Sequence, residues 1–185
     1  TRAKILGNGL KVYVLPIRGN GIVAVSAKIR GCGEIGASQD KTVLPALVGD
    51  MLSKGSAKFS KDQLSDAVQN MGSGFEPQVE PFWTSVESEV VVEDLDQLLS
   101  VFSDSLRTPK FKNDELERLK KQKVSEIKDA KAETSEVAAN KLLQTIYKNG
   151  CVYHQRTFDE QIAELDTVSR DDLVAFHKQH YVANN

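Results

Sequence analysis

The chain has 185 residues, of which 40% are hydrophobic and 27% are charged, and its formal net charge is −2. This composition is ordinary for a globular protein, and the length is enough for one domain with a buried core. The balance of charge argues against a nucleic-acid surface, no apolar run is long enough to span a membrane, and no secretory signal is visible. We therefore expect a soluble domain with neither nucleic acid nor membrane among its partners; the compartment stays open.

The two cysteines of the chain are Cys32 and Cys151. They could form one disulfide at most, and they lack the short spacings that are typical of metal ligands. We expect both to be free thiols.

Two segments near the N-terminus alternate apolar and polar residues, which is typical of strands with one buried face. The first, residues 10–15, follows an Asn-Gly turn. The second, residues 22–30, places Val25 and Ala27 on one face and Lys28 on the other. We expect these two segments to pair as a hairpin.

Residues 31–36 read Gly-Cys-Gly-Glu-Ile-Gly and match the dinucleotide-binding pattern G-x-G-x-x-G. In such sites the third glycine already lies on the helix whose N-terminus faces the pyrophosphate. Here residues 37–41 intervene before a helical pattern begins, and the acidic residue expected about 20 positions on would fall near Ser56. A flexible loop is the favoured interpretation, and a nucleotide-binding domain that uses residues 31–36 is the alternative.

Residues 43–56 predict a short, mostly apolar helix around which the rest of the chain is organised. The helix is entered through polar residues 40–42, and Pro45 falls in its first turn, where a missing N–H costs little. Lys54 and Gly55 close it.

A helix and two strands follow. Ser60 and Gln63 form a capping box at the start of the helix. In the first strand Pro77 lacks a backbone donor, which confines this strand to a sheet edge. Residues 82–90 alternate and predict a longer strand with one buried face. The short edge strand comprises Gly74, Phe75, Glu76, Pro77, Gln78 and Val79.

Helical periodicity dominates the remainder of the chain, and no linker or low-complexity tract divides it. The predicted helices are residues 93–107 and 113–132, a third that Thr134 and Ser135 cap, residues 158–164 and residues 169–181. Residues 1–185 therefore predict a single α+β domain, with an antiparallel or mixed β-sheet and helices packed mainly on one face.

Several short motifs, in their order and spacing, resemble the insulinase/pitrilysin family of zinc peptidases, which includes the mitochondrial processing peptidase. They are Leu-Gly-Asn-Gly-Leu-Lys-Val at residues 6–12, Met-Leu-Ser-Lys-Gly-Ser at 51–56, Ser-Glu-Ile at 125–127 and Ser-Arg-Asp-Asp-Leu at 169–173. The resemblance runs nearly end to end and implies a metalloprotease-like domain of the mitochondrial processing peptidase type.

In active relatives a His-x-x-Glu-His motif before the Met-Leu motif supplies two zinc ligands and the general base. The matching positions here are Ala46, Gly49 and Asp50, and a further glutamate of the family's metal shell corresponds to Glu126. Helical spacing places Glu126 on or beside the buried face of its helix. Alanine cannot ligate zinc and glycine cannot move a proton, so the resemblance implies a degenerate site with no catalytic residue and no metal. Asp50 and Glu126 are expected to form an ordinary polar pair, held by a lysine or arginine.

The family builds its enzymes from paired copies of this domain, of which one carries zinc. The resemblance therefore implies a catalytically silent domain of a zinc-dependent endopeptidase, part of a larger chain, that helps to enclose and bind peptide substrate. Its implied partners are peptide substrate and a homologous zinc-bearing domain or subunit, so zinc is expected in that partner and no cofactor here. A pure assembly or partner-subunit domain is the alternative.

His177 and His180 stand one helical turn apart, near Asp171 and Asp172. An adventitious metal site is one interpretation of this group. The favoured one is a packed imidazole beside a solvated imidazole.

Overall fold

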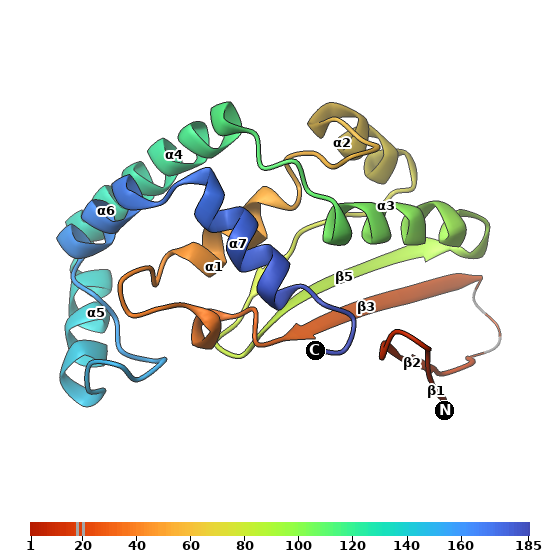
Figure 1. Cartoon of the computed structure of the whole chain (residues 1–185), viewed down its shortest axis with the longest axis horizontal. Coiled ribbons are helices and arrows are strands. Elements are labelled where there is room, and N and C mark those ends of the chain that lie inside the picture. The colour runs from red at the N-terminus through yellow and green to blue at the C-terminus, as the bar shows by residue number, and fades with distance from the viewer. Residues whose placement is uncertain (18, 20) are drawn as a thin grey trace.

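The computed structural model describes residues 1–17, 19 and 21–185, and it folds this part of the chain into two small antiparallel sheets and seven α-helices (Figure 1). Strand β1 (Arg2–Ile5) pairs with β2 (Lys11–Val14). Strand β5 (Trp83–Val91) lies between β3 (Ile22–Arg30) and the two-residue β4 (Gln78–Val79). The helices lie mainly on one face of this second sheet (Figure 1), so the predicted α+β class is confirmed.

The expected hairpin between residues 10–15 and 22–30 is wrong. β2 pairs with β1 across a tight turn, in which Leu6 N donates to Leu10 O at 2.8 Å and Gly9 has a φ of 89°. A short turn costs little chain entropy to close, and glycine tolerates the positive φ. β3 pairs instead with β5 over all nine of its residues.

The helices lie close to where the sequence predicts them. The capping box of Ser60 and Gln63 is confirmed, whereas the expected side-chain cap at residues 134 and 135 is wrong, because the helix begins at Thr134 and Glu133 precedes it without a capping bond. None of the helices within the described residues is long and apolar enough to cross a membrane. The helices are α1 (Leu44–Met51), α2 (Lys61–Asn70), α3 (Leu95–Arg107), α4 (Asn113–Ala132), α5 (Thr134–Ile146), α6 (Phe158–Thr167) and α7 (Arg170–His180), with 3-10 turns η1 (Glu34–Gly36) and η2 (Val92–Asp94).

Two clusters of buried apolar side chains form the core, and α1 connects them. Leu47, Val48 and Met51 belong to the first cluster, and Leu52, directly after α1, belongs to the second. Such burial stabilises each large side chain by about 1.5–3 kcal/mol. The first core cluster also contains Cys32, Leu44, Phe111, Leu116, Leu119, Leu165, Val168, Leu173 and Phe176, and the second core cluster contains Leu64, Val68, Met71, Phe75, Val86, Val90, Leu98, Val101 and Phe102.

A buried carboxylate on α3 holds the Lys-Gly-Ser turn that follows α1. Asp104 accepts hydrogen bonds from Ser56 Oγ at 2.5 Å, Lys58 N at 2.8 Å and Thr108 Oγ1 at 2.9 Å. Burial by itself would raise the pKa of Asp104, but these bonds outweigh it and the pKa lies below its usual value. Gly55 has a φ of 112°, which favours glycine. The Lys-Gly-Ser part of the motif at residues 51–56 is therefore explained by the structure of this turn, without a role in metal binding.

Candidate functional site

Helix α1 presents two of the positions that match the zinc motif on its solvent side. Ala46 is exposed and the side chain of Asp50 is 36% exposed, whereas the intervening Leu47 and Val48 are buried. Residues at i and i+4 share a helix face, so positions 46 and 50 point in the same direction. Gly49 is buried beside them.

A lysine on α4 lies between Asp50 and Glu126. Lys123 Nζ is 3.0 Å from Asp50 Oδ2 and 3.3 Å from Glu126 Oε2. Gln122 Nε2 donates to the other oxygen of Glu126 at 2.8 Å. The structure therefore brings Asp50 and Glu126 together through one ammonium group, although Glu126 is half exposed rather than on a buried face.

The electrostatics of this Asp50–Lys123–Glu126 triad favour its charged form. Partial burial disfavours the Lys123 ammonium, but hydrogen bonds and charge from Asp50 and Glu126 outweigh this effect and raise its pKa. The pKa of Glu126 is lowered, chiefly by the hydrogen bond from Gln122 and further by Lys123. Lys123 and Glu126 therefore stay charged at neutral pH.

The residues at these positions do not fit a zinc ion. A catalytic zinc site needs three protein ligands with nitrogen, sulfur or carboxylate donors, and Ala46 and Gly49 offer none. The Lys123 ammonium already lies between Asp50 and Glu126, so a metal cation would have to displace it to reach both carboxylates. In the part of the chain that the structure describes, no group of three His, Cys, Asp or Glu side chains could hold a metal ion.

A neighbouring strand fills the space beside the position of the family's general base. A Cβ atom on Gly49 would lie 2.4 Å from Val79 Cγ2 in β4. Two non-bonded carbon atoms prefer about 3.5–4.0 Å, so any larger side chain at position 49 would have to push Val79 aside. Glycine at this position lets β4 lie directly against α1.

The edge strand is shorter than the sequence predicts. Only Gln78 and Val79 of the six expected residues pair with β5, at the edge of the three-stranded sheet. Gly74, Phe75, Glu76 and Pro77 lie outside the strand. Phe75 is instead buried in the second core cluster, where it contacts Phe102 edge to face at 5.4 Å. The strand is too short to confirm a peptide-binding edge, which stays a prediction.

Residues 31–36 form a turn that is bound to the segment before β5. Gly31 N donates to Phe82 O at 2.9 Å. Glu34 N and Ile35 N donate to the carbonyl oxygens of the two residues before Phe82. A Cβ on Gly33 would lie 2.0 Å from Glu80 O, so this close approach requires glycine. The expected flexible loop is thus a hydrogen-bonded 3-10 turn. Its amides at Gly31, Glu34, Ile35 and Gly36 donate to backbone carbonyls, whereas the nucleotide-binding alternative needs free amides to hold a phosphate.

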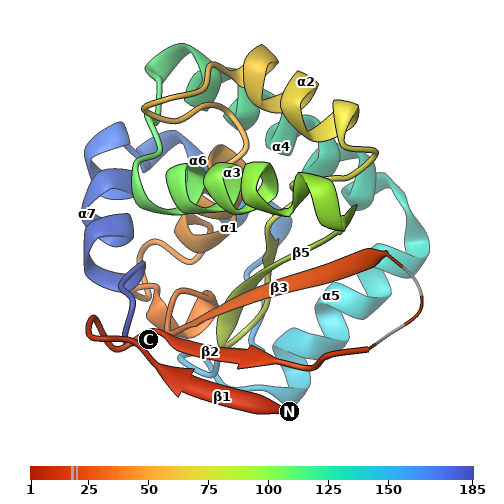
Figure 2. The ribbon, with the colours of Figure 1, turned by 90° about the vertical axis from the view of Figure 1, so that its right-hand side faces the viewer.

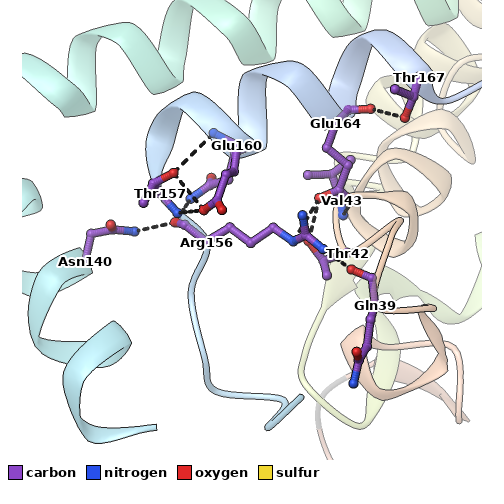
Figure 3. A network of polar contacts seen from close by, with 10 residues as sticks. Gln39, Thr42, Val43, Asn140, Arg156, Thr157, Glu160, Glu164 and Thr167 are labelled. Atoms are coloured by element: carbon purple, nitrogen blue, oxygen red, sulfur yellow. Dashed lines mark hydrogen bonds and ion pairs between the residues drawn. The ribbon is translucent and has the colours of Figure 1, made fainter. Parts of the chain in front are cut away.

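A buried glutamate on α6 positions α1, and no sequence motif signals it. Glu164, 5% exposed, accepts hydrogen bonds from Val43 N at 2.8 Å and Thr42 Oγ1 at 2.9 Å (Figure 3). Arg156 Nε lies 3.4 Å from the same carboxylate and its guanidinium also donates to Gln39 O. Helix α1 has no side-chain cap of its own, so Glu164 stabilises its N-terminus, where a negative charge is favourable.

A cavity of about 580 Å³ lies between η1 and the segment after α5. Its lining includes Ile35, Tyr147, Tyr153 and Arg156, and none of the four positions carried over from the family. It is therefore separate from the degenerate metal site.

Both histidines of α7 are partly buried, and each imidazole packs against at least one aromatic ring. His177 lies 4.8 Å from Tyr181 between ring centroids, and its Nε2 is 2.9 Å from Leu106 O. Burial lowers the pKa of His177 despite that hydrogen bond. His180 lies 4.4 Å from the ring of Phe176.

The two cysteines are free thiols, as predicted. Cys32 is fully buried, and its Sγ donates to Ile29 O at 2.9 Å. Burial raises the pKa of this thiol. Cys151 is exposed.

Solved structures of peptidases share this fold. A peptidase M16 inactive domain from Pseudomonas fluorescens matches with a TM-score of 0.84 at 17% identity, over 95% of this chain and 42% of that one. A protease from Helicobacter pylori matches with a TM-score of 0.86 at 16% identity, over 100% of this chain and 44% of that one. Pitrilysin matches with a TM-score of 0.80 at 20% identity, over 98% of this chain and 20% of that one. The chain thus spans less than half the length of each.

The sequence also matches a family directly. The model of the family described as Insulinase (Peptidase family M16) matches residues 34–157, which is more than half of the chain. No curated protein matches the chain. The matched residues include α1, α4 and β4, which carry the candidate site. The chain therefore belongs to the insulinase family, peptidase family M16.

Proposed function

We propose that this chain is a catalytically silent domain of a zinc-dependent M16 endopeptidase, one domain of a longer polypeptide, which helps to enclose and bind peptide substrate. One observation carries the proposal: at the position of the family's zinc motif, the Lys123 ammonium joins Asp50 and Glu126, beside Ala46 and Gly49. A homologous zinc-bearing domain or subunit then supplies the metal and the hydrolytic chemistry.

Contact with substrate is proposed at β4. An exposed sheet edge can pair with an extended peptide through backbone groups alone, and β4 is the edge of its sheet. Its two residues follow Pro77, which has no backbone N–H to donate. We therefore expect β4 to bind peptide weakly, so that it helps to enclose the substrate and adds little to the affinity.

The first test measures metal and proteolysis. The purified 185-residue chain should hold far less than one zinc ion per molecule by elemental analysis and should not cleave peptides, because the two histidines and the base of the family motif are missing. Stoichiometric zinc together with chelator-sensitive cleavage would contradict the proposal.

The second test places a photo-crosslinking amino acid at Gln78 in the longer, active protein. Gln78 is exposed and lies on the proposed edge strand β4, whereas Asp66 is exposed and lies on helix α2. Peptide substrate should be captured at Gln78 and not at Asp66. Equal capture at the two positions, or none at either, would favour the alternative of a pure assembly domain.

A further inference from the structure

The cavity between η1 and the segment after α5 is large enough for a small ligand. Its volume of about 580 Å³ falls within the range of about 300–1,000 Å³ that is usual for ligand sites. Residues between 34 and 43, Pro81, and residues between 143 and 161 line it. It lies at the end of the molecule where α5 is found, opposite α2 (Figure 2). Three segments that are far apart in the sequence therefore build one wall.

Two tyrosine rings form part of this wall. Tyr147 and Tyr153 line the cavity, and their ring centroids lie 5.4 Å apart. Phe82 extends this group of rings, with its centroid 6.2 Å from that of Tyr153. Tyr153 and Phe82 are 44% and 39% exposed, so a ligand can reach them. The face of an aromatic ring attracts a cation, because its π-electrons place negative charge there.

Hydrogen bonds hold the segment that carries the two tyrosines. His154 Nδ1 lies 2.7 Å from Tyr147 O, and His154 N donates to Cys151 O at 2.9 Å. Asn140 Nδ2 on α5 donates to Arg156 O at 3.1 Å, which fixes the far end of the segment (Figure 3). The rings are therefore in place before a ligand arrives, which lowers the entropy cost of binding.

The guanidinium in the wall already has partners within the chain. Arg156 lines the cavity, but its Nε lies 3.4 Å from Glu164 Oε2 and its guanidinium also donates to Gln39 O (Figure 3). Its positive charge is compensated by the buried carboxylate. Arg156 therefore does not make the cavity a site for anions.

The carboxylate of Glu34 lies in the same wall without such a partner. Among the described residues, no lysine, arginine or histidine forms an ion pair with Glu34 or with the nearby Glu80. Desolvation by the surrounding wall, and then the charge of Glu80, raise the pKa of Glu34. The negative charge of Glu34 is thus uncompensated, and a cation in the cavity would stabilise it.

The glycine-rich turn at residues 31–36 places Glu34 in the wall. The lack of a Cβ at Gly33 lets the turn approach Glu80 O, and Ile35 N donates to Pro81 O at 2.9 Å. The turn is thereby fixed to the segment before β5, with Glu34 at the cavity. The pattern that resembles a nucleotide site therefore presents a carboxylate, which would repel a phosphate.

We propose that this cavity binds an organic cation, a guanidinium or alkylammonium group that lies against the rings of Tyr147 and Tyr153 and pairs with the carboxylate of Glu34. Rings and carboxylate attract the same positive charge. A guanidinium fits best, because its plane stacks on a ring while two of its N–H groups bond to the carboxylate. The cation comes either from a peptide side chain or from a free small amine. The site is separate from β4 and from the degenerate zinc site, so it does not depend on the proposed function.

Isothermal titration calorimetry of the full-length protein, with a chelator present to keep peptides intact, tests the inference with two probes. Agmatine is a free guanidinium compound, and a terminally blocked, alanine-rich heptapeptide with one central arginine carries the same group on a peptide. The arginine peptide should bind at least about tenfold more tightly than the same peptide with citrulline, its neutral analogue of similar shape. Tighter binding of the peptide than of agmatine would assign the site to peptides, and the reverse would assign it to free small cations.

Variants locate the bound cation. Glu34→Gln keeps the shape of the side chain and should reduce the preference for arginine over citrulline to less than about twofold. Tyr153→Leu should weaken binding of the arginine peptide by about fivefold, whereas Tyr153→Phe keeps the ring and should bind it normally. Glu93→Gln changes an exposed carboxylate in η2 and is the matched control.

Two results would overturn the inference: equal binding of the arginine and citrulline peptides, or a preference for arginine that Glu34→Gln leaves unchanged. Neither result depends on whether substrate is captured at Gln78. The cation site and the proposed function can therefore fail separately.

Discussion

Three charged side chains surround α1, and each is held by partners from another element. Asp104 bonds the turn after α1, Glu164 bonds the turn before it, and Lys123 joins Asp50 on α1 to Glu126. Glu164 and Asp104 are buried, where a charge is costly unless it is paired or hydrogen-bonded. The half-exposed Lys123 contributes less to stability and more to the chemistry of the site, because it places a positive charge where a metal would need to bind.

Zinc titration tests this account of Lys123. Ala46→His, Gly49→Glu and Asp50→His together supply two ligands, and Glu126 supplies a third. We expect weak binding, because Lys123 repels the ion and Val79 crowds position 49. Adding Lys123→Gln should strengthen zinc binding at least about tenfold, or 1.4 kcal/mol.

Two controls accompany this titration. Lys128→Gln removes an exposed lysine from the same helix and should leave zinc affinity unchanged. Glu126→Gln, added to the variant with Lys123→Gln, should weaken it. If Glu126→Gln has no effect, α1 and α4 do not bring these side chains together, and the site carried over from the family must be abandoned.

At the scale of elements, α1 depends on its neighbours more than on its own sequence. It has only eight residues and lacks a side-chain cap, and helices this short are marginal in isolation. Burial of Leu47, Val48 and Met51 and the carboxylate of Glu164 stabilise it. The helix at the centre of the family-like motif is therefore fixed by tertiary contacts.

Glu164→Gln should lower the free energy of unfolding by about 1.5–3 kcal/mol, since it removes the charge from the carboxylate that accepts hydrogen bonds from Val43 N and Thr42 Oγ1. Urea unfolding measures this loss, and faster exchange of the first amides of α1 would locate it. Asp166→Asn changes an exposed carboxylate on the same helix and should cost less than about 0.5 kcal/mol. Equal losses in the two variants would mean that Glu164 does not support α1.

At the scale of the whole molecule, α7 ties the two core clusters together. Tyr181 packs against both clusters, and its hydroxyl donates to the buried Thr84 Oγ1 of β5 at 3.2 Å. His177 joins α7 to the C-terminal end of α3 through Leu106 O. Phe111 also packs against His177, with ring centroids 5.6 Å apart. The imidazole is thus enclosed at a junction of several elements.

The stability of this junction should depend on pH through His177. Its pKa in the folded state is lowered by burial, so between the two pKa values the unfolded chain binds more protons. Stability contributed by the neutral imidazole is therefore present above the unfolded value of about 6.5 and is lost as the pH falls below it. Urea unfolding at pH 7.5 and 5.5 should show this loss. His177→Gln should show a smaller loss, and an equal loss would assign the effect to other groups.

The sequence by itself determined the family, the α+β class and most helix boundaries, because apolar periodicity, capping boxes and short motifs are local signals. The 20 residues of α4 begin and end where their pattern predicts. The sequence also shows directly that Ala46, Gly49 and Asp50 replace the His-x-x-Glu-His residues of active relatives. The pairing of strands is not a local property. β3 pairs with β5, which lies more than 50 residues further along the chain, and not with β2, which precedes it directly. The same holds for Glu164, which caps a helix from 121 residues away, and for Lys123 between two carboxylates. Only the tertiary structure decided these features, because each depends on which surfaces meet once the core has formed.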